Sequence, residues 1–440
     1  MNTQPHKLPE EKKKQLCALL CDVKLNLLYK ASVHGYYANT FHMRCDRQGP
    51  TLLVAYNTSG YIFGGYTSKD YTQSGQYVTD EEAFLFYFQG QNPVCIKVNM
   101  GCNARLDDAK GPSFGQQLHF CYNNQPTVYN QAGNAFTINT TLMYGNNTNL
   151  TECEVYKIEK ISVDEKPLKY MEWTTEQREE LVNFFKNHKP LVSSVNRVRI
   201  LMIGPVGAGK SSFFNSINSI FMGRMTNKAM AGSLGTSLTK EFRTYPVKDG
   251  RDGKPLPFVL CDTMGLEEQT GAGLDIEDIS SIIHGLIPDQ YKFNPVSPFD
   301  PFEQKSFTPA SLEQKIHCVV FVIDTSKISL MSTKLEEKLV AIRKKVNSLR
   351  VPQIVLLTKV DEACPVVEKD LQKVYLSSYI KKKVQEVSSR LGVPVSCVLP
   401  VKNYSQEHEL NLSCDLLLLT AVQQMLNFAE DYLGDAAAAI

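Results

Sequence analysis

The 440-residue chain is predicted to contain two domains of different class: an N-terminal α+β domain built on a β-sandwich, and a C-terminal α/β domain with a doubly wound, mainly parallel sheet. Three observations lead to this prediction. Residues 52–156 carry short, aromatic-rich runs broken by Gly and Asn clusters, which is typical of antiparallel strands. Residues 197–212 join an apolar strand to a glycine-rich loop and a helical pattern. Apolar strand runs then alternate with helical patterns to about residue 433.

The composition argues against several classes of protein. The 47 Lys and Arg residues nearly balance the 46 Asp and Glu residues, so the charge does not indicate a nucleic-acid partner. No unbroken apolar run is long enough to predict a membrane span, and the polar N-terminus lacks the apolar core of a secretory signal. The 12 cysteines show no CxxC spacing, which indicates free thiols in a reducing compartment. We therefore expect a cytoplasmic protein.

The first domain is predicted to span residues 1–158. Leu and Val recur at near-helical spacing over residues 9–31, which predicts one helix there. A glycine turn at 57–60 predicts a β-hairpin. The histidines of this region have no nucleophile or carboxylate partner at a readable spacing, so we predict an interaction module that recruits protein partners.

A helical linker is predicted over residues 159–195. Thr174 and Gln177 have the spacing of a helix N-cap pair, and the helix is expected to end near Asn187. The second domain is then predicted to cover residues 196–440.

A phosphate-binding loop is predicted from the pattern G-x-x-x-x-G-K-S after an apolar strand. Its glycines allow a tight turn in which consecutive N–H groups point at phosphate oxygens, and the following helix presents its positive end to the same anion. The lysine would reach the phosphates, and the serine after it would bind Mg²⁺. The predicted nucleotide-binding residues of this loop are Gly204, Pro205, Val206, Gly207, Ala208, Gly209, Lys210, Ser211 and Ser212.

A D-x-x-G motif at the end of the next strand predicts the second part of the same site. Asp262 would hold Mg²⁺, usually through water, and the N–H of Gly265 would face the last phosphate. The Ser- and Thr-rich loop 232–247 between the two motifs is expected to supply a threonine that closes on the metal. Thr236 is the predicted ligand, and Thr239 is the alternative.

A T-K-x-D motif at the end of a further buried strand predicts which base is bound. The Asp361 carboxylate would accept from N1–H and the 2-amino group of guanine together, a donor pair that adenine lacks. The stem of Lys359 would lie over the purine face. We therefore predict a GTP/GDP site that includes Thr358, Lys359 and Asp361. The base-supporting loop that follows departs from the usual S-A-K pattern, and Asn403 is its predicted contact.

Leu266 stands where signalling GTPases often carry the glutamine that orients the attacking water. A leucine side chain can neither orient nor polarise water. We expect slow hydrolysis, or hydrolysis that needs a partner or self-association, and no catalytic residue is assigned. The proline-rich segment 266–314 is predicted to be a surface insertion.

The first domain resembles the TLDc domain over roughly residues 25–158, most specifically in its GPTLLV and GYIFGGY stretches. The resemblance implies a β-sandwich flanked by short helices, without an agreed catalytic centre. Some TLDc proteins bind the vacuolar ATPase, which raises that enzyme as a partner by resemblance only.

The whole chain resembles the interferon-induced protein 44 family, including its 44-like branch. The likeness rests on the TLDc-like half followed by GPVGAGKSSFFNSINSIF, DTMGLEE, KIHCVVFVIDTS and LLTKVDE. It implies a cytoplasmic, interferon-induced GTP-binding protein of the antiviral innate immune response. Two alternatives stay open: a nucleotide-independent scaffold with a degenerate G domain, and an adenine-nucleotide enzyme, which the guanine-selecting Asp361 disfavours.

Overall fold

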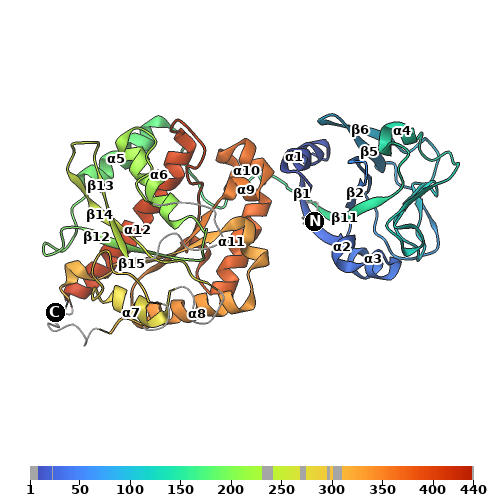
Figure 1. The fold of residues 1–440 in the computed structure, drawn as a ribbon. Helices are drawn as coiled ribbons and strands as arrows, with labels where there is room; N and C mark the ends of the chain where they lie inside the picture. The colour runs from blue at the N-terminus through green and yellow to red at the C-terminus, as the bar shows by residue number, and fades with distance from the viewer. Residues whose placement is uncertain are drawn as a thin grey trace. The chain divides into compact units, whose positions relative to one another are not determined.

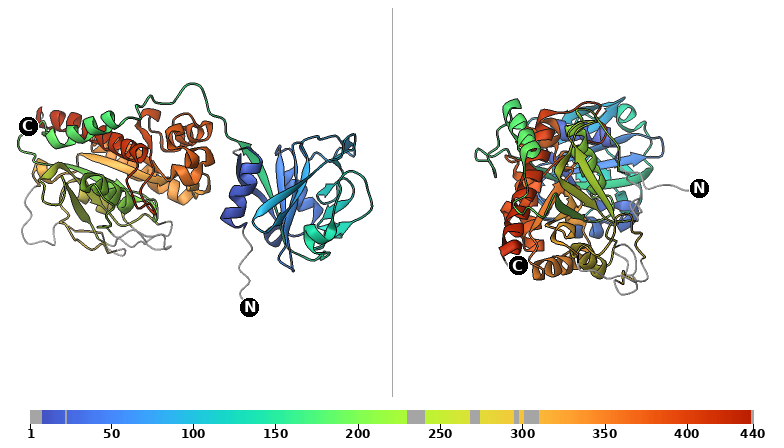
Figure 2. Two further views of the ribbon diagram at one scale, coloured as in Figure 1. Left: turned by 90° about the horizontal axis from the view of Figure 1, so that it is seen from above. Right: turned by 90° about the vertical axis from the view of Figure 1, so that its left-hand side faces the viewer.

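The computed structural model describes residues 8–21, 23–229, 241–267, 274–294, 298–300 and 310–438. Thr236 and its alternative Thr239 lie outside these ranges. The chain divides into two compact units, Met1–Ile161 and Ser162–Ile440 (Figures 1 and 2).

The first unit is built on a six-stranded antiparallel sheet. Its strands, in spatial order, are β1 (Val23–Lys30), β11 (Leu150–Lys160), β2 (Thr51–Asn57), β3 (Ile62–Thr67), β5 (Phe84–Gln89) and β6 (Asn92–Lys97). All seven residues of β2 are buried, because the strand lies inside the sheet and both faces of the sheet are covered. Leu53 and Ala55 enter one core, and Leu52 and Val54 enter the other.

A smaller sheet covers one face of the large sheet. It contains β8 (Ser113–Phe114), β9 (Leu118–Phe120) and β10 (Val128–Asn130), and its Leu118 and Phe120 share a core with Leu53 and Phe63. The opposite face is covered by α1 (Glu10–Leu19), whose Leu16 packs beside Leu52. This arrangement of two packed sheets confirms the predicted β-sandwich. The remaining elements are α2 (Ala31–His34), α3 (Ala38–Cys45), α4 (Thr140–Tyr144), the short pair β4 (Tyr77–Val78) and β7 (Arg105–Leu106), and a 3₁₀ turn at Tyr122–Asn124.

The prediction of one helix over residues 9–31 is wrong in its second half. The helix ends at Leu19, Cys21 takes a left-handed φ of 65°, and Val23–Lys30 form strand β1. β1 pairs with β11 along its length, so hydrogen bonds to a distant segment decide its conformation. Apolar residues in a short run fit both periods, and sequence spacing does not distinguish them.

Two consecutive glycines of β3 allow close packing, Gly64 against the neighbouring strand β2 of the same sheet and Gly65 against β8 of the smaller sheet. A Cβ on Gly64 would lie 1.8 Å from the Leu53 carbonyl oxygen, and a Cβ on Gly65 would lie 2.5 Å from the Phe114 ring. The GYIFGGY stretch therefore has a steric reason for both glycines.

The second unit is organised around a six-stranded sheet in the order β13-β14-β12-β15-β16-β17. Only β13, at one edge, runs antiparallel to its neighbour. The strands are β12 (Val198–Ile203), β13 (Arg243–Lys248), β14 (Pro255–Asp262), β15 (Cys318–Asp324), β16 (Gln353–Thr358) and β17 (Val398–Pro400). β15 is buried at every residue, as expected for a central parallel strand with helices on both faces.

Helices cover both faces of this sheet, which confirms the doubly wound α/β class (Figure 1). α12 contacts α5 and α6 over one face, and α8 contacts α7 and α11 over the other. The helices are α5 (Thr175–Asn187), α6 (Lys210–Met222), α7 (Ile276–Ile283), α8 (Thr333–Ser348), α9 (Val360–Ala363), α10 (Pro365–Lys369), α11 (Ser378–Leu391) and α12 (Leu412–Ala438). Short 3₁₀ turns lie at Leu312–Gln314, Thr325–Leu330, Leu371–Lys373 and Val395–Cys397.

The helix predicted in the linker packs within the second unit. Thr174 caps α5 as predicted, because its side chain accepts from the Gln177 N–H at 3.2 Å. α5 contacts β14 and α12, and Arg178 forms an ion pair with the buried Asp415 at 2.6 Å.

α12 is the only helix among the described residues that is long and apolar enough to cross a membrane. A helix that is packed inside a domain can have the same length and composition. In the most apolar stretch of α12, 61% of the residues are buried in the second unit, where the helix contacts β12 and β15.

Candidate functional site

The glycine-rich loop joins the end of β12 to the start of α6, at the carboxyl edge of the parallel sheet. Gly207 and Gly209 have φ values of 74° and 97°, which only glycine adopts readily. A Cβ on Gly204 would lie 2.1 Å from the Val322 carbonyl oxygen, so this glycine allows the loop to pass close to β15. Since the first turn of a helix has no intrahelical acceptors for its N–H groups, the start of α6 presents donors and a positive dipole end at this edge.

Lys210 is held inside the loop. Its ammonium group donates to the carbonyl oxygens of Gly204 and Pro205 at 3.0 and 3.1 Å, and the residue is only 7% exposed. Burial lowers the pKa of Lys210, and the charge of Asp262 acts in the opposite direction. A phosphate oxygen at this position would be a stronger partner for the ammonium group than neutral carbonyls are.

Ser211 and Asp262 come together although they are on different elements. The Ser211 hydroxyl donates to Asp262 Oδ2 at 2.6 Å, and the Thr263 N–H donates to Asp262 Oδ1 at 2.9 Å. A hydroxyl and a carboxylate oxygen are ligands that suit Mg²⁺. In the described part of the chain, no group of three or more His, Cys, Asp or Glu side chains is arranged so that it could hold a metal ion. A cation at this pair would therefore take further oxygen ligands from phosphate and water.

The T-K-x-D motif is bonded directly to the glycine-rich loop. The Thr358 hydroxyl donates to the Ala208 carbonyl at 2.6 Å across 150 residues of sequence, and the Thr325 hydroxyl donates to the Thr358 carbonyl at 2.6 Å. Lys359 takes a left-handed φ of 57°, and its ammonium group lies 2.9 Å from Asp324 Oδ2 at the end of β15. These contacts fix the start of the motif against the loop.

Asp361 has a cationic partner that the sequence did not predict. Its Oδ2 lies 3.3 Å from the ammonium nitrogen of Lys402, which lies 2.8 Å from Glu407 Oε1. Burial acts to lower the pKa of Lys402, but the hydrogen bond that it donates to Glu407 and the charge of Asp361 outweigh burial and raise the pKa. Lys402 is therefore charged at neutral pH and lies beside the predicted guanine-binding carboxylate.

Asn403 supports the glycine-rich loop from the base side. Its Nδ2 donates to the Gly209 carbonyl at 3.0 Å, and a Cβ on Gly209 would lie 2.9 Å from that nitrogen. Its Oδ1 is buried and has no hydrogen-bond partner among the described residues. The next residue, Tyr404, is held by Ser216 of α6 and by Asp415 of α12.

The segment after Asp262 lies against the loop as well. The Leu266 N–H donates to the Gly204 carbonyl at 3.0 Å, and the Val206 N–H donates to the Leu266 carbonyl at 3.3 Å. A Cβ on Gly265 would lie 2.7 Å from Val206 Cγ2, so a larger residue does not fit there without a shift. The Leu266 side chain is buried and offers no polar group to the site.

Most of the predicted site residues therefore meet at one edge of the sheet. The structure brings together the loop 204–211, Asp262, Gly265, Thr358 and Asn403 through the contacts above, while Ser212 lies in α6, where its carbonyl accepts from Ser216. Whether these residues bind a nucleotide stays a prediction. Lys402 and Asp324 were not predicted as site residues, although Asp324 is the last residue of β15 and Lys402 follows β17, and both strands end at this same edge. That position is the signal that would have identified them.

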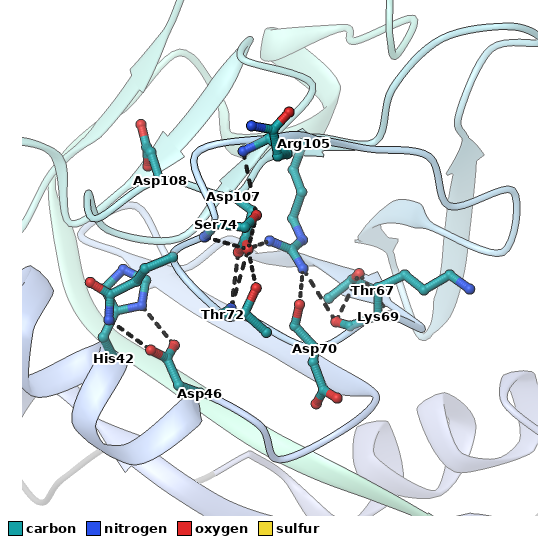
Figure 3. A network of polar contacts seen from close by, with 12 residues as sticks. His42, Asp46, Thr67, Lys69, Asp70, Thr72, Ser74, Arg105, Asp107 and Asp108 are labelled. Atoms are coloured by element: carbon teal, nitrogen blue, oxygen red, sulfur yellow. Dashed lines mark hydrogen bonds and ion pairs between the residues drawn. The ribbon is translucent and has the colours of Figure 1, made fainter.

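The first unit contains a second polar cluster, shown in Figure 3. The buried Asp107 carboxylate accepts from the side chains and N–H groups of Thr72 and Ser74, and Arg105 donates to it at 2.7 Å. Arg105 also donates to the Asp70 carbonyl. Burial acts to raise the pKa of Asp107, but its hydrogen bonds to Thr72, Ser74 and Arg105 outweigh it and lower the pKa.

His42, in the same region, is also held by protein groups on both sides. Its Nδ1 lies 2.7 Å from Asp46 Oδ1, and its Nε2 lies 2.7 Å from the Lys110 carbonyl. The charges of the cluster therefore neutralise one another, and both ring nitrogens of His42 have partners, while Arg105 Nε is buried without a hydrogen-bond partner among the described residues. The geometry of the cluster is that of a structural network.

Comparison with known proteins identifies the family. The TLDc domain family matches residues 6–172. The human interferon-induced protein 44-like is 35% identical over 431 residues, covering 95% of this chain and 92% of its own length. The human interferon-induced protein 44 is 35% identical over 424 residues, covering 94% and 90%.

A solved structure of Era from Aquifex aeolicus, bound to GDP and aluminium fluoride, is 12% identical and covers 53% of this chain and 57% of its own, with a TM-score of 0.29. That similarity is too low to support an argument about fold or ligand. The identity to the two human proteins extends over nearly the full length of the chain and includes both units. The chain belongs to the interferon-induced protein 44 family.

Proposed function

We propose that this protein binds GTP and GDP with Mg²⁺ through its second unit and acts in the interferon-induced innate immune response. The observation that carries the proposal is the bond from Thr358 to Ala208, which joins the base motif to the phosphate loop. Since a nucleotide needs its base and its phosphates bound at a fixed separation, this bond gives the two motifs a common frame.

The residues at the edge fit the groups of such a ligand. The loop N–H groups and Lys210 would bind phosphates, and Ser211 and Asp262 would hold Mg²⁺. Asp361 would accept from the guanine N1–H and 2-amino group. Bound Mg²⁺ would neutralise phosphate charge, while Lys210 and the helix end would orient the phosphates.

We further propose that hydrolysis is slow in the isolated protein. Leu266 is buried, and its main chain is bonded to Gly204 and Val206, so it supplies no group that could orient water. Glu267 is the nearest described carboxylate along the chain, and Glu268 lies outside the described residues. Single-turnover assays of the purified protein should give slow GTP cleavage; rapid cleavage would contradict this part of the proposal.

Calorimetric titration of the full-length protein with GTP, GDP and ATP tests binding. Both guanine nucleotides should bind in the presence of Mg²⁺, and ATP should bind much more weakly because it lacks the donor pair for Asp361. Equal displacement of GTP by ATP would instead favour an adenine-nucleotide enzyme. Absence of GTP binding by folded protein would refute the proposal.

A second candidate is a scaffold that acts through its TLDc unit without a nucleotide. It is favoured by Leu266 and by the departure of residues 401–404 from the usual base loop. With either candidate, we propose a cytoplasmic location and an antiviral action, and we propose the vacuolar ATPase as a partner of the TLDc unit. Co-purification from interferon-treated cells, with residues 1–158 deleted as the control, would test the partner. Loss of cellular function in Lys210→Ala, with folding and partner binding intact, would rule out a nucleotide-independent scaffold.

A further inference from the structure

Lys402 lies beside the carboxylate that is proposed to recognise guanine. Its ammonium nitrogen is 3.3 Å from Asp361 Oδ2, although Asp361 follows β16 and Lys402 follows β17. Because these strands are parallel neighbours, their carboxyl ends bring the two side chains to the same edge of the sheet.

The position of this ammonium group is fixed from two sides. Glu407 Oε1 lies 2.8 Å from it, and Glu407 Oε2 accepts from the N–H groups of Ser405 and Gln406. The Lys402 carbonyl accepts from the Cys414 thiol at 3.2 Å, which ties the residue to α12. The side chain is 25% exposed, so most of it is enclosed by protein. Lys402 is therefore an ordered cation, unlike a surface lysine that samples many rotamers.

The hydrogen-bonding edge of guanine has three groups in a row. The 2-amino group and N1–H are donors, and O6 is an acceptor. A carboxylate accepts only, so Asp361 satisfies the two donors and leaves O6 without a donor. An ammonium group donates only, and one is held next to this carboxylate. Adenine presents a 6-amino donor in place of O6, which would face the ammonium group unfavourably.

We infer that Lys402 is a specificity-determining residue of the guanine site, whose ammonium group donates to O6 of the base that Asp361 holds. The inference rests on the proposed nucleotide-binding function. In a rival account, Lys402 only masks Asp361 in the free protein. That account predicts that replacing Lys402 strengthens GTP binding, because a masking cation is removed, whereas our inference predicts weaker binding.

Three nucleoside triphosphates that differ in the 2-amino, N1–H and O6 groups of the base can show which of these groups Lys402 contacts. GTP carries all three groups, inosine triphosphate keeps N1–H and O6, and 2-aminopurine riboside triphosphate keeps the 2-amino group but has neither N1–H nor O6. Affinities are measured by calorimetry on the full-length protein. Lys402→Met should weaken the binding of GTP and of inosine triphosphate about tenfold, because each loses one hydrogen bond from a charged donor. The affinity of this variant for 2-aminopurine riboside triphosphate should stay within about twofold of the wild-type value.

Two further variants control the experiment. Lys381→Met removes a lysine with a comparable ion pair to Asp164, at 2.7 Å and 21% exposure, away from the motifs, and should change no affinity. Glu407→Gln keeps Lys402 but removes the charge that holds it, and should weaken GTP and inosine triphosphate about threefold without affecting the third ligand. Thermal unfolding without ligand shows whether Lys402→Met is folded. If it is not folded, the inference is tested with Glu407→Gln instead.

Three results would overturn the inference: unchanged GTP affinity in Lys402→Met, tighter GTP binding, or an equal loss for all three ligands. Each of these requires that the wild-type protein binds GTP. Absence of GTP binding by the wild type is a different result, and it would refute the proposed function and this inference together.

Discussion

Two clusters, one in each unit, bury charged side chains in different ways. In the first unit, Arg105 and Asp107 are 1% and 2% exposed, lie 2.7 Å apart and neutralise each other. In the second unit, the buried Lys210 donates to two neutral carbonyls, and Asp262 accepts from a serine hydroxyl and a main-chain N–H.

This difference in the partners of the buried charges distinguishes a structural ion pair from a binding site. A buried cation and anion that satisfy each other hold loops in place and are strongly destabilising when one is removed. A buried cation on neutral partners gains more from an anionic ligand than it does from the folded protein alone. The same residue types therefore indicate a structural network in the first unit and a phosphate site in the second.

Breaking the pair in the first unit should give the largest effect. Arg105→Met leaves Asp107 buried without its cation, so the free energy of unfolding should fall by about 3–5 kcal/mol. Hydrogen exchange of β2 and β11 would localise the loss to this unit, because the only tryptophan, Trp173, reports on the other. Arg44→Met, at an exposed arginine of the same unit, should stay within about 0.5 kcal/mol. A similar small loss in Arg105→Met would mean that the network is dispensable.

The stability of the two units should depend differently on pH in the acid range. Burial, together with the charge of Arg199, lowers the pKa of His317 from 6.5 to about 4, although the hydrogen bond that its Nε2 donates to the Leu312 carbonyl acts in the opposite direction. Its Nδ1 accepts from the Arg199 N–H, which requires that this nitrogen carries no proton. A histidine with a lowered folded pKa contributes fully above its unfolded pKa, so the second unit should lose about 3 kcal/mol as pH falls from 6.5 to 4. The lowered pKa of Asp107 preserves its contribution until the pH falls below the unfolded carboxyl value.

Urea unfolding followed by Trp173 fluorescence at several pH values measures this loss. His317→Gln should flatten the pH dependence between 6.5 and 4. An identical pH dependence in wild type and variant would assign the acid sensitivity to other groups.

Removing the buried cation of the second unit should reduce binding and spare stability. Lys210→Met should weaken GTP binding about 100-fold, through loss of charged hydrogen bonds to phosphate. The free energy of unfolding should stay equal or rise, because burial already disfavours the charged form. Calorimetry and urea titration measure the two quantities, with Lys186→Met, at an exposed surface pair, as the control. A large loss of stability in Lys210→Met would place it with Arg105 as an architectural residue.

The smallest effect should come from the metal pair. Ser211→Ala removes the hydroxyl that bonds Asp262 at 2.6 Å, and should weaken GTP binding about tenfold in Mg²⁺. In EDTA the variant and wild type should bind equally, because the hydroxyl acts through the cation. Equal losses in both conditions would show that Ser211 acts on the phosphates or on the fold.

The sequence was sufficient where local pattern and topology agree. The class of both domains follows from the pattern of strands and helices, and the Thr174 cap follows from the spacing of Thr174 and Gln177. The convergence of the glycine loop with Asp262 and Thr358 follows from motifs at strand ends. Long-range pairing was not readable, because no local pattern encodes it. β1 was taken for a helix since its partner β11 lies more than a hundred residues away.

The unpredicted part of the site has the same origin. The contacts of Lys402 with Asp361 and of Leu266 with Gly204 depend on how loops from different strands approach one another. The spacing of residues along one segment does not contain that information.

The central claim is that Asp361 recognises the donor pair of guanine at this edge. The most direct test is a titration of wild type and Asp361→Asn with GTP and xanthosine triphosphate. Xanthine carries a carbonyl where guanine has its 2-amino group, and an asparagine amide can donate to it while accepting from N1–H. The account predicts that wild type prefers GTP and that Asp361→Asn prefers xanthosine triphosphate. Unchanged GTP affinity in the variant, or an equal loss for both ligands, would contradict it.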